Sequence, residues 1–419
     1  MDYIITPPDE MLECTVELPL SKSLSARQLI IDAVSGLTSD AELAQCDDTD
    51  ILRAALGRNS GTVDVGAAGT AMRFLTAYYA ATPGTDVVLD GCERMRKRPI
   101  ALLVDALRLL GADIEYAGEE GFAPLHIRGR RLAGGTVEID ASVSSQFVSA
   151  LMMVGPTMEA PLHIVLRNNI ASAPYIKMTA GMMERRGADV EIAGQTVIVS
   201  PGKYTCAGGA IERDWSAASY WYAIAAISAG WVTLPGLEEH SMQGDAAMRA
   251  FGERIGVLTA FDDEDAPDAA VLSASPEQHS RLTIDMTATP DLVPALAVAS
   301  FTLGIPFHFT GVATLRDKEC DRIAALTAEA LKLGGIFESE NVDTLSWDGR
   351  RCPVGERPMI DTYGDHRMAM AFAPVSIFVP GIVIRDAEVV SKSYPRFWEQ
   401  LAEAGFTVAE FTGEEVPAE

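Results

Sequence analysis

The sequence predicts a two-domain protein in which helices and strands alternate, and three features support this fold class. Its 419 residues, 48% of them hydrophobic, exceed what one hydrophobic core normally supports. One local pattern, an amphipathic helical run that ends at glycine and is followed by a short apolar strand, occurs six times. The 35 glycines and 22 prolines are spread along the whole chain, which is typical of many short elements joined by tight turns.

Each copy of the helix-glycine-strand pattern places a glycine where the end of a helix favours a left-handed residue. The strand that follows alternates apolar and polar side chains, as in residues 112–116. The copies are too widely spaced for a solenoid, so they predict two α/β domains of three small units each. They span residues 51–65, 103–116, 182–192, 248–260, 326–337 and 401–411.

The net charge of −26 argues against nucleic acid or an anionic membrane as a partner. The first ten residues include acids but no basic residue, which is unlike a secretory signal, and no run of 18 apolar residues occurs. We therefore expect a soluble, cytoplasmic protein. The six cysteines form no C-x-x-C motif and no paired spacing with histidine, which predicts reduced thiols and no metal site.

Seven segments gather basic or hydroxyl side chains beside glycine, serine or proline. Lys22 and Arg27, for example, stand at the start of a predicted helix, where free backbone N–H groups and the helix dipole attract anions. Each segment alone also fits an ordinary helix cap or a solvated surface. Together, in so acidic a chain, they predict one pocket for highly anionic ligands. The segments are 20–27, 66–73, 93–100, 142–146 with 172–175, 316–322, 364–370 and 391–395.

Two carboxylates are expected among these cations. Asp291 follows Thr289 and Pro290, and Glu319 stands between Lys318 and Arg322. Beside substrate hydroxyls, carboxylates in such positions can act as a base and as a proton relay.

The ordered motifs resemble those of the 5-enolpyruvylshikimate-3-phosphate synthase family, and the likeness covers about residues 20–398. The motifs are Ser-Lys-Ser-x-Ser-x-Arg, Gly-Thr-Ala-Met-Arg, Arg-x-Arg-Pro-Ile, Ser-Val-Ser-Ser-Gln, Pro-Asp, Lys-Glu-x-Asp-Arg, Asp-His-Arg-Met-Ala-Met and Ser-Lys-Ser-Tyr-Pro. The resemblance implies two inside-out α/β domains, each of three βαβαββ repeats, with the active site in the cleft between them. The expected domains are residues 21–236 and residues 1–20 plus 237–419.

The resemblance also implies a set of substrate-binding residues. For shikimate 3-phosphate the set is Lys22, Ser23, Arg27, Ser144, Ser145, Gln146, Ser172, Tyr175, Asp291 and Lys318. For phosphoenolpyruvate it is Lys22, Gly69, Arg98, Gln146, Arg322, Arg367 and Lys392. Two polyanions held side by side need such charge-assisted donors.

The implied reaction transfers an enolpyruvyl group by addition and elimination. Asp291 is expected to accept the proton of the acceptor hydroxyl, and Glu319 with Lys22 to deliver and remove the other protons. No cofactor and no metal is expected. The expected partners are the two small-molecule substrates, with no nucleic acid and no membrane, and the chain is expected to be a monomer.

Three positions bear on how far the family's pattern applies. Ala67 and Thr314 stand where the family usually has asparagine, which puts two amide contacts to substrate in doubt. Gly69, where inhibitor-tolerant members often carry alanine, leaves room for glyphosate and predicts sensitivity to it.

Two other functions remain as alternatives, and a third is disfavoured. The related transferase acting on UDP-N-acetylglucosamine carries a reactive cysteine near the position of Cys92, but it begins with Lys-Asn. A non-catalytic homologue that binds shikimate 3-phosphate is suggested by Ala67 and Thr314. RNA-end processing on a related repeat conflicts with the acidic charge balance.

Overall fold

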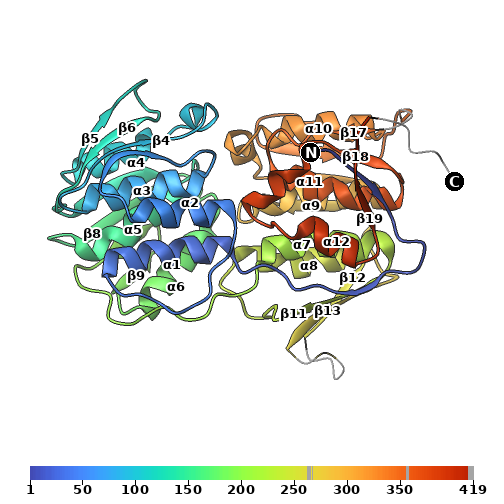
Figure 1. Cartoon of the computed structure of the whole chain (residues 1–419), viewed down its shortest axis with the longest axis horizontal. Coiled ribbons are helices and arrows are strands. Elements are labelled where there is room, and N and C mark those ends of the chain that lie inside the picture. Colours follow the sequence, from blue (N-terminus) through green and yellow to red (C-terminus); the bar gives the residue numbers. More distant parts are fainter. Residues whose placement is uncertain (262–265, 267, 355–357, 414–419) are drawn as a thin grey trace. The chain divides into compact units, whose positions relative to one another are not determined.

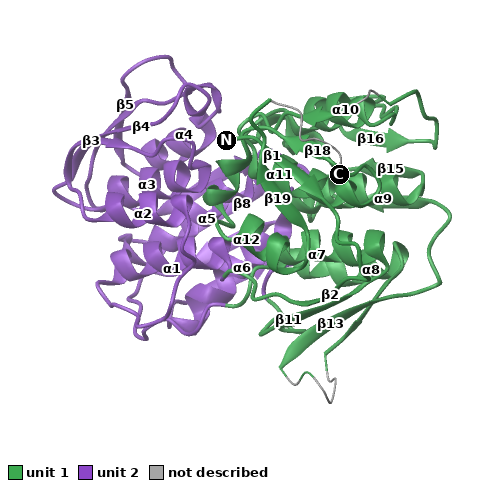
Figure 2. Cartoon of the chain, turned by 45° about the vertical axis from the view of Figure 1, so that its right-hand side comes forward, with its two compact units in different colours: residues 1–19, 212–241, 245–419 green, residues 20–211, 242–244 purple. Residues whose placement is uncertain are grey.

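The computed structural model describes residues 1–261, 266, 268–354 and 358–413. The chain forms two compact units (Figure 2): unit 1 contains residues 1–19, 212–241 and 245–419, and unit 2 contains residues 20–211 and 242–244. Each unit has its own hydrophobic core.

The chain enters unit 2 after Pro19 and leaves it after Ile211. The second boundary therefore differs from the expected one at Gly236. The segment between the two positions belongs to unit 1 because its helix and its strand are both packed there. Helix α7 (Trp215–Ser228) contacts α9 (Val293–Leu303), and strand β11 (Trp231–Pro235) pairs with β13 (Ala269–Ala274).

Unit 2 contains six helices and two four-stranded sheets. The helices are α1 (Lys22–Ser35), α2 (Asp47–Leu56), α3 (Gly69–Ala81), α4 (Ala101–Leu109), α5 (Ser145–Val154) and α6 (Ala173–Arg185). Strands β3 (Ser60–Asp64), β4 (Asp86–Asp90), β6 (Leu125–Arg128) and β5 (Asp113–Tyr116) form one sheet in that order. Strands β7 (Gly135–Asp140), β8 (Leu162–Arg167), β10 (Thr196–Val199) and β9 (Val190–Ala193) form the other.

Unit 1 contains three sheets within its described residues. Besides α7 and α9, its helices are α8 (Met248–Arg254), α10 (Arg322–Lys332), α11 (His366–Phe372) and α12 (Phe397–Glu403). Its sheets are β2 (Glu13–Thr15), β11, β13 and β12 (Val257–Ala260); β14 (Leu282–Asp285), β15 (Phe307–Thr310) and β16 (Thr344–Trp347); and β17 (Met359–Ile360), β18 (Ile382–Ile384), β1 (Tyr3–Thr6) and β19 (Thr407–Glu410).

All five sheets share one topology. Two parallel strands lie at one side, a third strand pairs antiparallel with the second, and a fourth, where present, pairs antiparallel with the third. In the sheet of β14, β15 and β16 the fourth strand is reduced to isolated bridges, Gly335 with Arg351 and Glu338 with Ser346. In unit 2 two such sheets form, and helices α1 and α2 precede the first strand of both.

The six copies of the helix-glycine-strand pattern show where the sequence prediction was accurate. Five of the glycines, among them Gly111 and Gly405 with φ of 99°, are left-handed. Gly57 is the exception: its φ is −80°, so the prediction of a left-handed residue was wrong there. A named strand follows the glycine in every copy except 326–337, where only the two bridges form.

The helices, rather than the sheets, form the centre of each unit. Every residue of α5 except Gln146 is buried, and α9 is buried from Val293 to Phe301. Figure 1 shows α3 and α5 in one unit, and α7, α9 and α11 in the other, with strands farther out. This is the inside-out arrangement, and it brings helix N-termini, the sites of many predicted residues, close to one another inside each unit.

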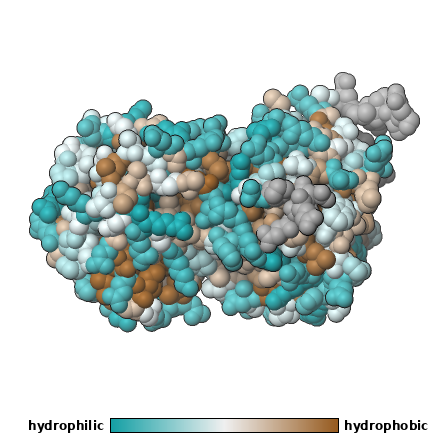
Figure 3. All heavy atoms as spheres, turned by 90° about the horizontal axis from the view of Figure 1, so that it is seen from below, coloured by the Kyte–Doolittle hydropathy of each residue, from teal (hydrophilic) through white to brown (hydrophobic). Residues whose placement is uncertain are grey.

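Across the described part of the chain, no helix is both long enough and apolar enough to span a bilayer. On the face drawn in Figure 3, most of the surface is hydrophilic, and hydrophobic residues occur in smaller separate groups. A mostly polar surface is consistent with the charged composition of the sequence.

Candidate active site

Asp291 lies at the centre of a cluster of basic side chains in unit 1. Its carboxylate accepts hydrogen bonds from Arg322 Nη1 at 2.9 Å and Arg367 Nη2 at 3.2 Å. Lys318 Nζ lies 3.3 Å from the same carboxylate, and Arg367 Nη1 donates to the Asp291 backbone carbonyl at 3.1 Å. The structure thus brings three predicted phosphate-binding cations onto the predicted base.

Arg322 extends this cluster to two further carboxylates. It is 1% exposed and donates to Glu319 Oε2 at 2.8 Å and to Asp365 Oδ2 at 2.7 Å. Lys392 Nζ pairs with Glu319 Oε1 at 3.2 Å. These contacts therefore join four cations to three carboxylates within one cluster.

Helix N-termini hold most of these residues. Asp291 lies in the 3₁₀ turn that precedes α9, and Arg322 is the first residue of α10. Arg367 follows Asp365, whose carboxylate caps α11 by accepting from the Arg367 backbone N–H at 2.9 Å. Backbone N–H groups at such helix ends add to the positive potential of the side chains.

The charge of Asp291 is controlled by its neighbours. Burial by itself would raise the pKa of Asp291, but the positive charges of Arg367, Lys318 and Arg322 hold that pKa well below its usual range. The carboxylate is therefore ionised at neutral pH and, without ligands, is a weak base. Anionic substrates that engage the same cations would neutralise part of this field and raise its basicity.

Asp365 is a component of this cluster that was not among the predicted site residues. It is fully buried and binds Arg322 through Oδ2 while capping α11 through Oδ1. The available signal was its place before His366 and Arg367, where an aspartate at a helix start is a typical N-cap. The contact with Arg322, 43 residues away, has no signal in the sequence.

Arg27 is a buried cation of unit 2, and it is held without a carboxylate. Its Nε donates to Thr179 Oγ1 at 2.7 Å, its Nη1 to the Ser23 carbonyl at 2.9 Å and its Nη2 to Ser149 Oγ at 3.2 Å. The guanidinium carbon lies 5.4 Å from the Phe74 ring and 5.6 Å from the Tyr175 ring. Burial lowers the pKa of Arg27 to about 10. An arginine in such a setting favours an incoming anion.

Lys22 starts the same helix and has an acidic neighbour. Its Nζ lies 2.9 Å from Asp48 Oδ2, and Asp48 lies in the first turn of α2. Both side chains are mostly buried, which fixes the ammonium group at the N-terminal end of α1. Asp48 was not among the predicted site residues.

Gly69 begins α3 beside two arginines. A Cβ at this position would lie 2.5 Å from Arg98 Nη1 and 3.0 Å from Arg73 Nη1. Arg98 is mostly buried, and its Nε has no hydrogen-bond partner within the described part of the chain. Gln146 Nε2 donates to Thr70 Oγ1 at 3.1 Å, which places this amide beside the start of α3. A larger residue at position 69 would therefore displace the guanidinium group of Arg98.

Hydroxyl groups mark the starts of α5 and α6. Ser144 caps α5 by accepting from the Gln146 backbone N–H at 3.2 Å, and Ser145 is the first residue of that helix. Ser172 precedes α6 with φ of 56°, a left-handed conformation that costs a serine energy. Such strain is often retained at ligand sites.

The predicted residues therefore form two groups, one in each unit. Unit 2 contains Lys22, Ser23, Arg27, Gly69, Arg98, Ser144, Ser145, Gln146, Ser172 and Tyr175. Unit 1 contains Asp291, Lys318, Glu319, Arg322, Arg367 and Lys392. Of the two unusual positions, Thr314 lies in a 3₁₀ turn before Lys318, and its buried hydroxyl has no hydrogen-bond partner within the described residues.

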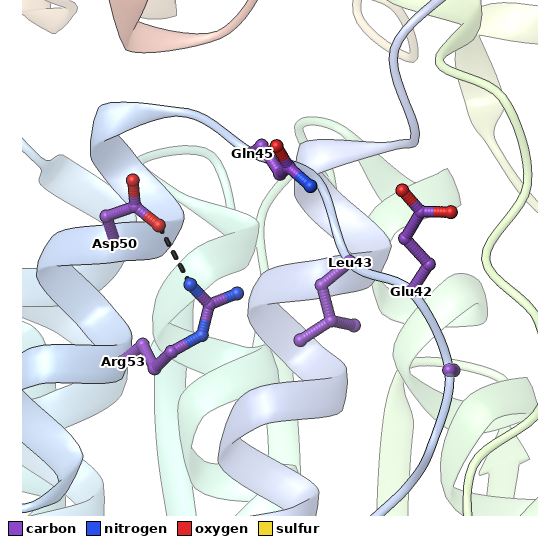
Figure 4. Close-up of a pocket in the computed structure, with 6 residues that line it drawn as sticks. Glu42, Leu43, Gln45, Asp50 and Arg53 are labelled. Atoms are coloured by element: carbon purple, nitrogen blue, oxygen red, sulfur yellow. Dashed lines mark hydrogen bonds and ion pairs between the residues drawn. The ribbon is translucent and has the colours of Figure 1, made fainter.

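A cavity of about 490 Å³ in unit 2 lies apart from the predicted residues. It is lined by Ala41, Glu42, Leu43, Gln45, Asp50 and Arg53. Figure 4 shows Arg53 turned toward Asp50, with which it pairs at 2.8 Å, and Glu42 on the other side of Leu43. Two carboxylates and one already paired arginine do not suit an anionic ligand.

Fold and charge together define a class: a two-domain α/β protein of inside-out repeats with buried cationic groups for anionic small molecules. A sequence profile described as "EPSP synthase (3-phosphoshikimate 1-carboxyvinyltransferase)" matches residues 53–401. The chain belongs to the EPSP synthase family.

Individual relatives agree with that membership. A 3-phosphoshikimate 1-carboxyvinyltransferase of Bacteroides fragilis (strain YCH46) is 45% identical over 411 residues, which cover 97% of this chain and 99% of the relative. One of Methanoculleus marisnigri is 38% identical over 346 residues, covering 81% and 78%. The solved EPSP synthase of Acinetobacter baumannii superimposes with a TM-score of 0.74 at 22% identity, covering 98% of this chain and 100% of that one, which supports the fold.

Proposed function

We propose that this enzyme transfers the enolpyruvyl group of phosphoenolpyruvate to the 5-hydroxyl of shikimate 3-phosphate and releases phosphate. The cluster around Asp291 is the observation that carries the proposal, because it combines a buried carboxylate base with four cations. Membership of the family and the names of its relatives supply the substrates.

Each substrate would be held by groups suited to its charges. Arg322, Arg367 and Lys392 would bind the phosphate and carboxylate of phosphoenolpyruvate, together with Arg98 beside Gly69. Arg27 would bind the carboxylate of shikimate 3-phosphate. The 3-phosphate of the same substrate would lie against Ser144, Ser145, Ser172 and Lys318. Binding in these positions is supported by the charge-assisted donors that each group presents.

The chemistry would proceed through a tetrahedral intermediate. A proton adds to the methylene carbon of phosphoenolpyruvate, and the 5-hydroxyl attacks the resulting cationic carbon while Asp291 accepts its proton. The bond to phosphate then breaks, and the new methyl group loses a proton to restore the double bond. Glu319, bonded to both Lys392 and Arg322, and Lys22, paired with Asp48, are the proposed proton carriers.

Phosphate release from the purified protein tests this assignment. With phosphoenolpyruvate present, shikimate 3-phosphate should support steady release, whereas UDP-N-acetylglucosamine should not. Preference for the sugar nucleotide would establish the rival transferase. Binding of shikimate 3-phosphate without turnover would establish the non-catalytic homologue.

Substitution of Asp291 tests the proposed base. We expect Asp291→Ala to bind both substrates but to lose about 10²–10⁴-fold in kcat, because hydroxyl deprotonation loses its base. Single-turnover kinetics and equilibrium binding separate the two effects. A rate near that of the native enzyme would remove Asp291 from the base role.

The protein's setting is part of the same proposal. We infer a cytoplasmic monomer that needs no cofactor and no metal, with the two substrates as its partners. Sedimentation of the purified chain, with and without both substrates, would reveal a stable dimer if one forms.

A further inference from the structure

Two buried hydroxyl groups, those of Thr179 and Ser149, form hydrogen bonds with Arg27. Thr179 and Ser149 are both fully buried, on α6 and α5, and lie 152 and 122 residues from Arg27 in sequence. Thr179 Oγ1 accepts from Arg27 Nε at 2.7 Å, and Ser149 Oγ accepts from Nη2 at 3.2 Å. The two hydroxyls are also bonded to each other at 2.8 Å.

These contacts fix the orientation of the guanidinium plane. Nε and Nη2 on one side are bound by Thr179 and Ser149, while one N–H of Nη1 is bound by the Ser23 carbonyl. Nη2 also reaches the Tyr175 carbonyl, at 3.5 Å, a long contact. Because a guanidinium has five N–H groups, one on Nη1 has no acceptor among the described residues. This one N–H of Nη1 is left to donate to a ligand.

The choice of hydroxyls over carboxylates has a chemical consequence. No carboxylate of the described residues pairs with Arg27, so its charge stays available to a ligand. A hydroxyl can orient a cation by accepting a hydrogen bond without neutralising it. A carboxylate in the place of Thr179 would orient Arg27 equally well and would compete with the ligand.

We propose that Thr179 and Ser149 are positioning residues that set the affinity and selectivity of the enzyme for the carboxylate of its cyclic acceptor. They act by orienting Arg27 and do not contribute to the binding of phosphoenolpyruvate. This inference rests on the proposed function in one respect, that the ligand of Arg27 is the carboxylate of shikimate 3-phosphate.

The central variant is Thr179→Val, which keeps the shape of the side chain and removes the hydroxyl. A hydrogen bond to a charged group is lost, so we expect the Kd for shikimate 3-phosphate, measured by calorimetry, to rise roughly 10- to 100-fold. The KM for phosphoenolpyruvate should change less than about threefold. Thr179→Ser retains the hydroxyl and should restore most of the acceptor affinity, and Ser149→Ala should give a smaller loss.

Thr76→Val is the matched control. Thr76 is equally buried in a helix and donates to the carbonyl four residues earlier, at 2.7 Å, as Thr179 does to Tyr175 at 2.8 Å. Thr76 makes no contact with Arg27 among the described hydrogen bonds. It should therefore lose a similar amount of stability, by thermal unfolding, without a selective loss of acceptor affinity.

An acceptor analogue in which hydroxymethyl replaces the carboxylate separates positioning from a general structural effect. The native enzyme should discriminate strongly between the two acceptors, and Thr179→Val should discriminate about tenfold less. An unchanged ratio, or equal losses for acceptor and phosphoenolpyruvate, would overturn the inference. Because calorimetry needs no turnover, a Thr179 effect on binding in a protein without transferase activity would support the inference while refuting the proposed reaction.

Discussion

The two most buried arginines of the candidate site have opposite electrostatic environments. Arg322 in unit 1 contacts three carboxylates, those of Asp291, Glu319 and Asp365. Arg27 in unit 2 contacts only hydroxyls, carbonyls and aromatic rings. The first arginine is part of a preassembled network in which charges compensate one another, and the second keeps a charge that a ligand must compensate.

Under the proposed function, this difference gives the two units different roles. Around Arg322, acids and bases are packed together, so proton transfer can be coupled to the binding of an anion. Around Arg27, no described acid is paired with the cation, so the arrangement favours recognition of a carboxylate. The following substitutions test that comparison, starting from the largest expected effect.

Replacing each arginine by methionine should affect stability in contrasting ways. Arg322→Met leaves three carboxylates near one another without their shared partner, and we expect the free energy of unfolding to fall by about 3–5 kcal/mol. Arg27→Met leaves only hydroxyls and carbonyls, and the change should stay within about 1 kcal/mol. Urea unfolding without ligands measures both. Equal losses in the two variants would contradict the comparison.

The next largest expected effect comes from adding a side chain at Gly69, where little space is available. Gly69→Ala would place Cβ 2.5 Å from Arg98 Nη1, so the guanidinium must move. We expect the KM for phosphoenolpyruvate to rise about 10- to 100-fold, with little change for shikimate 3-phosphate. Initial-rate kinetics with each substrate varied in turn measure this.

Gly181→Ala is the matched control for Gly69→Ala. Its Cβ would lie 3.6 Å from Met242 Sδ, an ordinary contact, so its kinetics should stay near those of the native enzyme. The native enzyme should also be inhibited by glyphosate and Gly69→Ala less so. Native activity that persists at millimolar-order glyphosate would refute this expected sensitivity.

The smallest effect concerns Asp245, a buried acid at the edge of the unit 1 cluster. Burial, and then the negative charge of Asp291, raise the pKa of Asp245 to about 6 from 3.8, while Arg367 and Ser216 oppose the rise. Since the folded state binds the proton more tightly, the contribution of Asp245 to stability is greatest below about pH 4 and is lost as pH rises to about 6.

Asp245→Asn should therefore flatten this part of the pH profile. Between pH 4 and pH 7, the free energy of unfolding of the variant should fall by on the order of 1 kcal/mol less than that of the native protein. Urea midpoints between pH 4 and 7.5 provide the measurement. Ser216→Ala, which removes a hydroxyl that donates to Asp245, should move the inflection to higher pH. If stability falls by the same amount over this pH range in Asp245→Asn and in the native protein, Asp245 is not the source of the fall.

The sequence indicated much of this arrangement because its signals are local. A helix-ending glycine such as Gly405 and an N-terminal lysine such as Lys22 are recognisable from a few neighbouring residues. The alternation of helices and strands followed, as did the position of many predicted site residues near helix starts. The missing strand after Gly334 was not predictable, because only two isolated bridges form there despite a favourable local pattern.

What the sequence by itself determined was the alternating fold, the six glycine-marked repeats and the identity of the cations that an acidic chain concentrates beside glycine and serine. The tertiary structure decided which partner each cation has: Arg322 with Asp365 and Arg27 with Thr179, pairs separated by 43 and 152 residues. It also assigned residues 212–236 to unit 1. The physical reason is that a local pattern fixes backbone geometry, whereas the partner of a buried charge depends on which distant helix ends the core packs together.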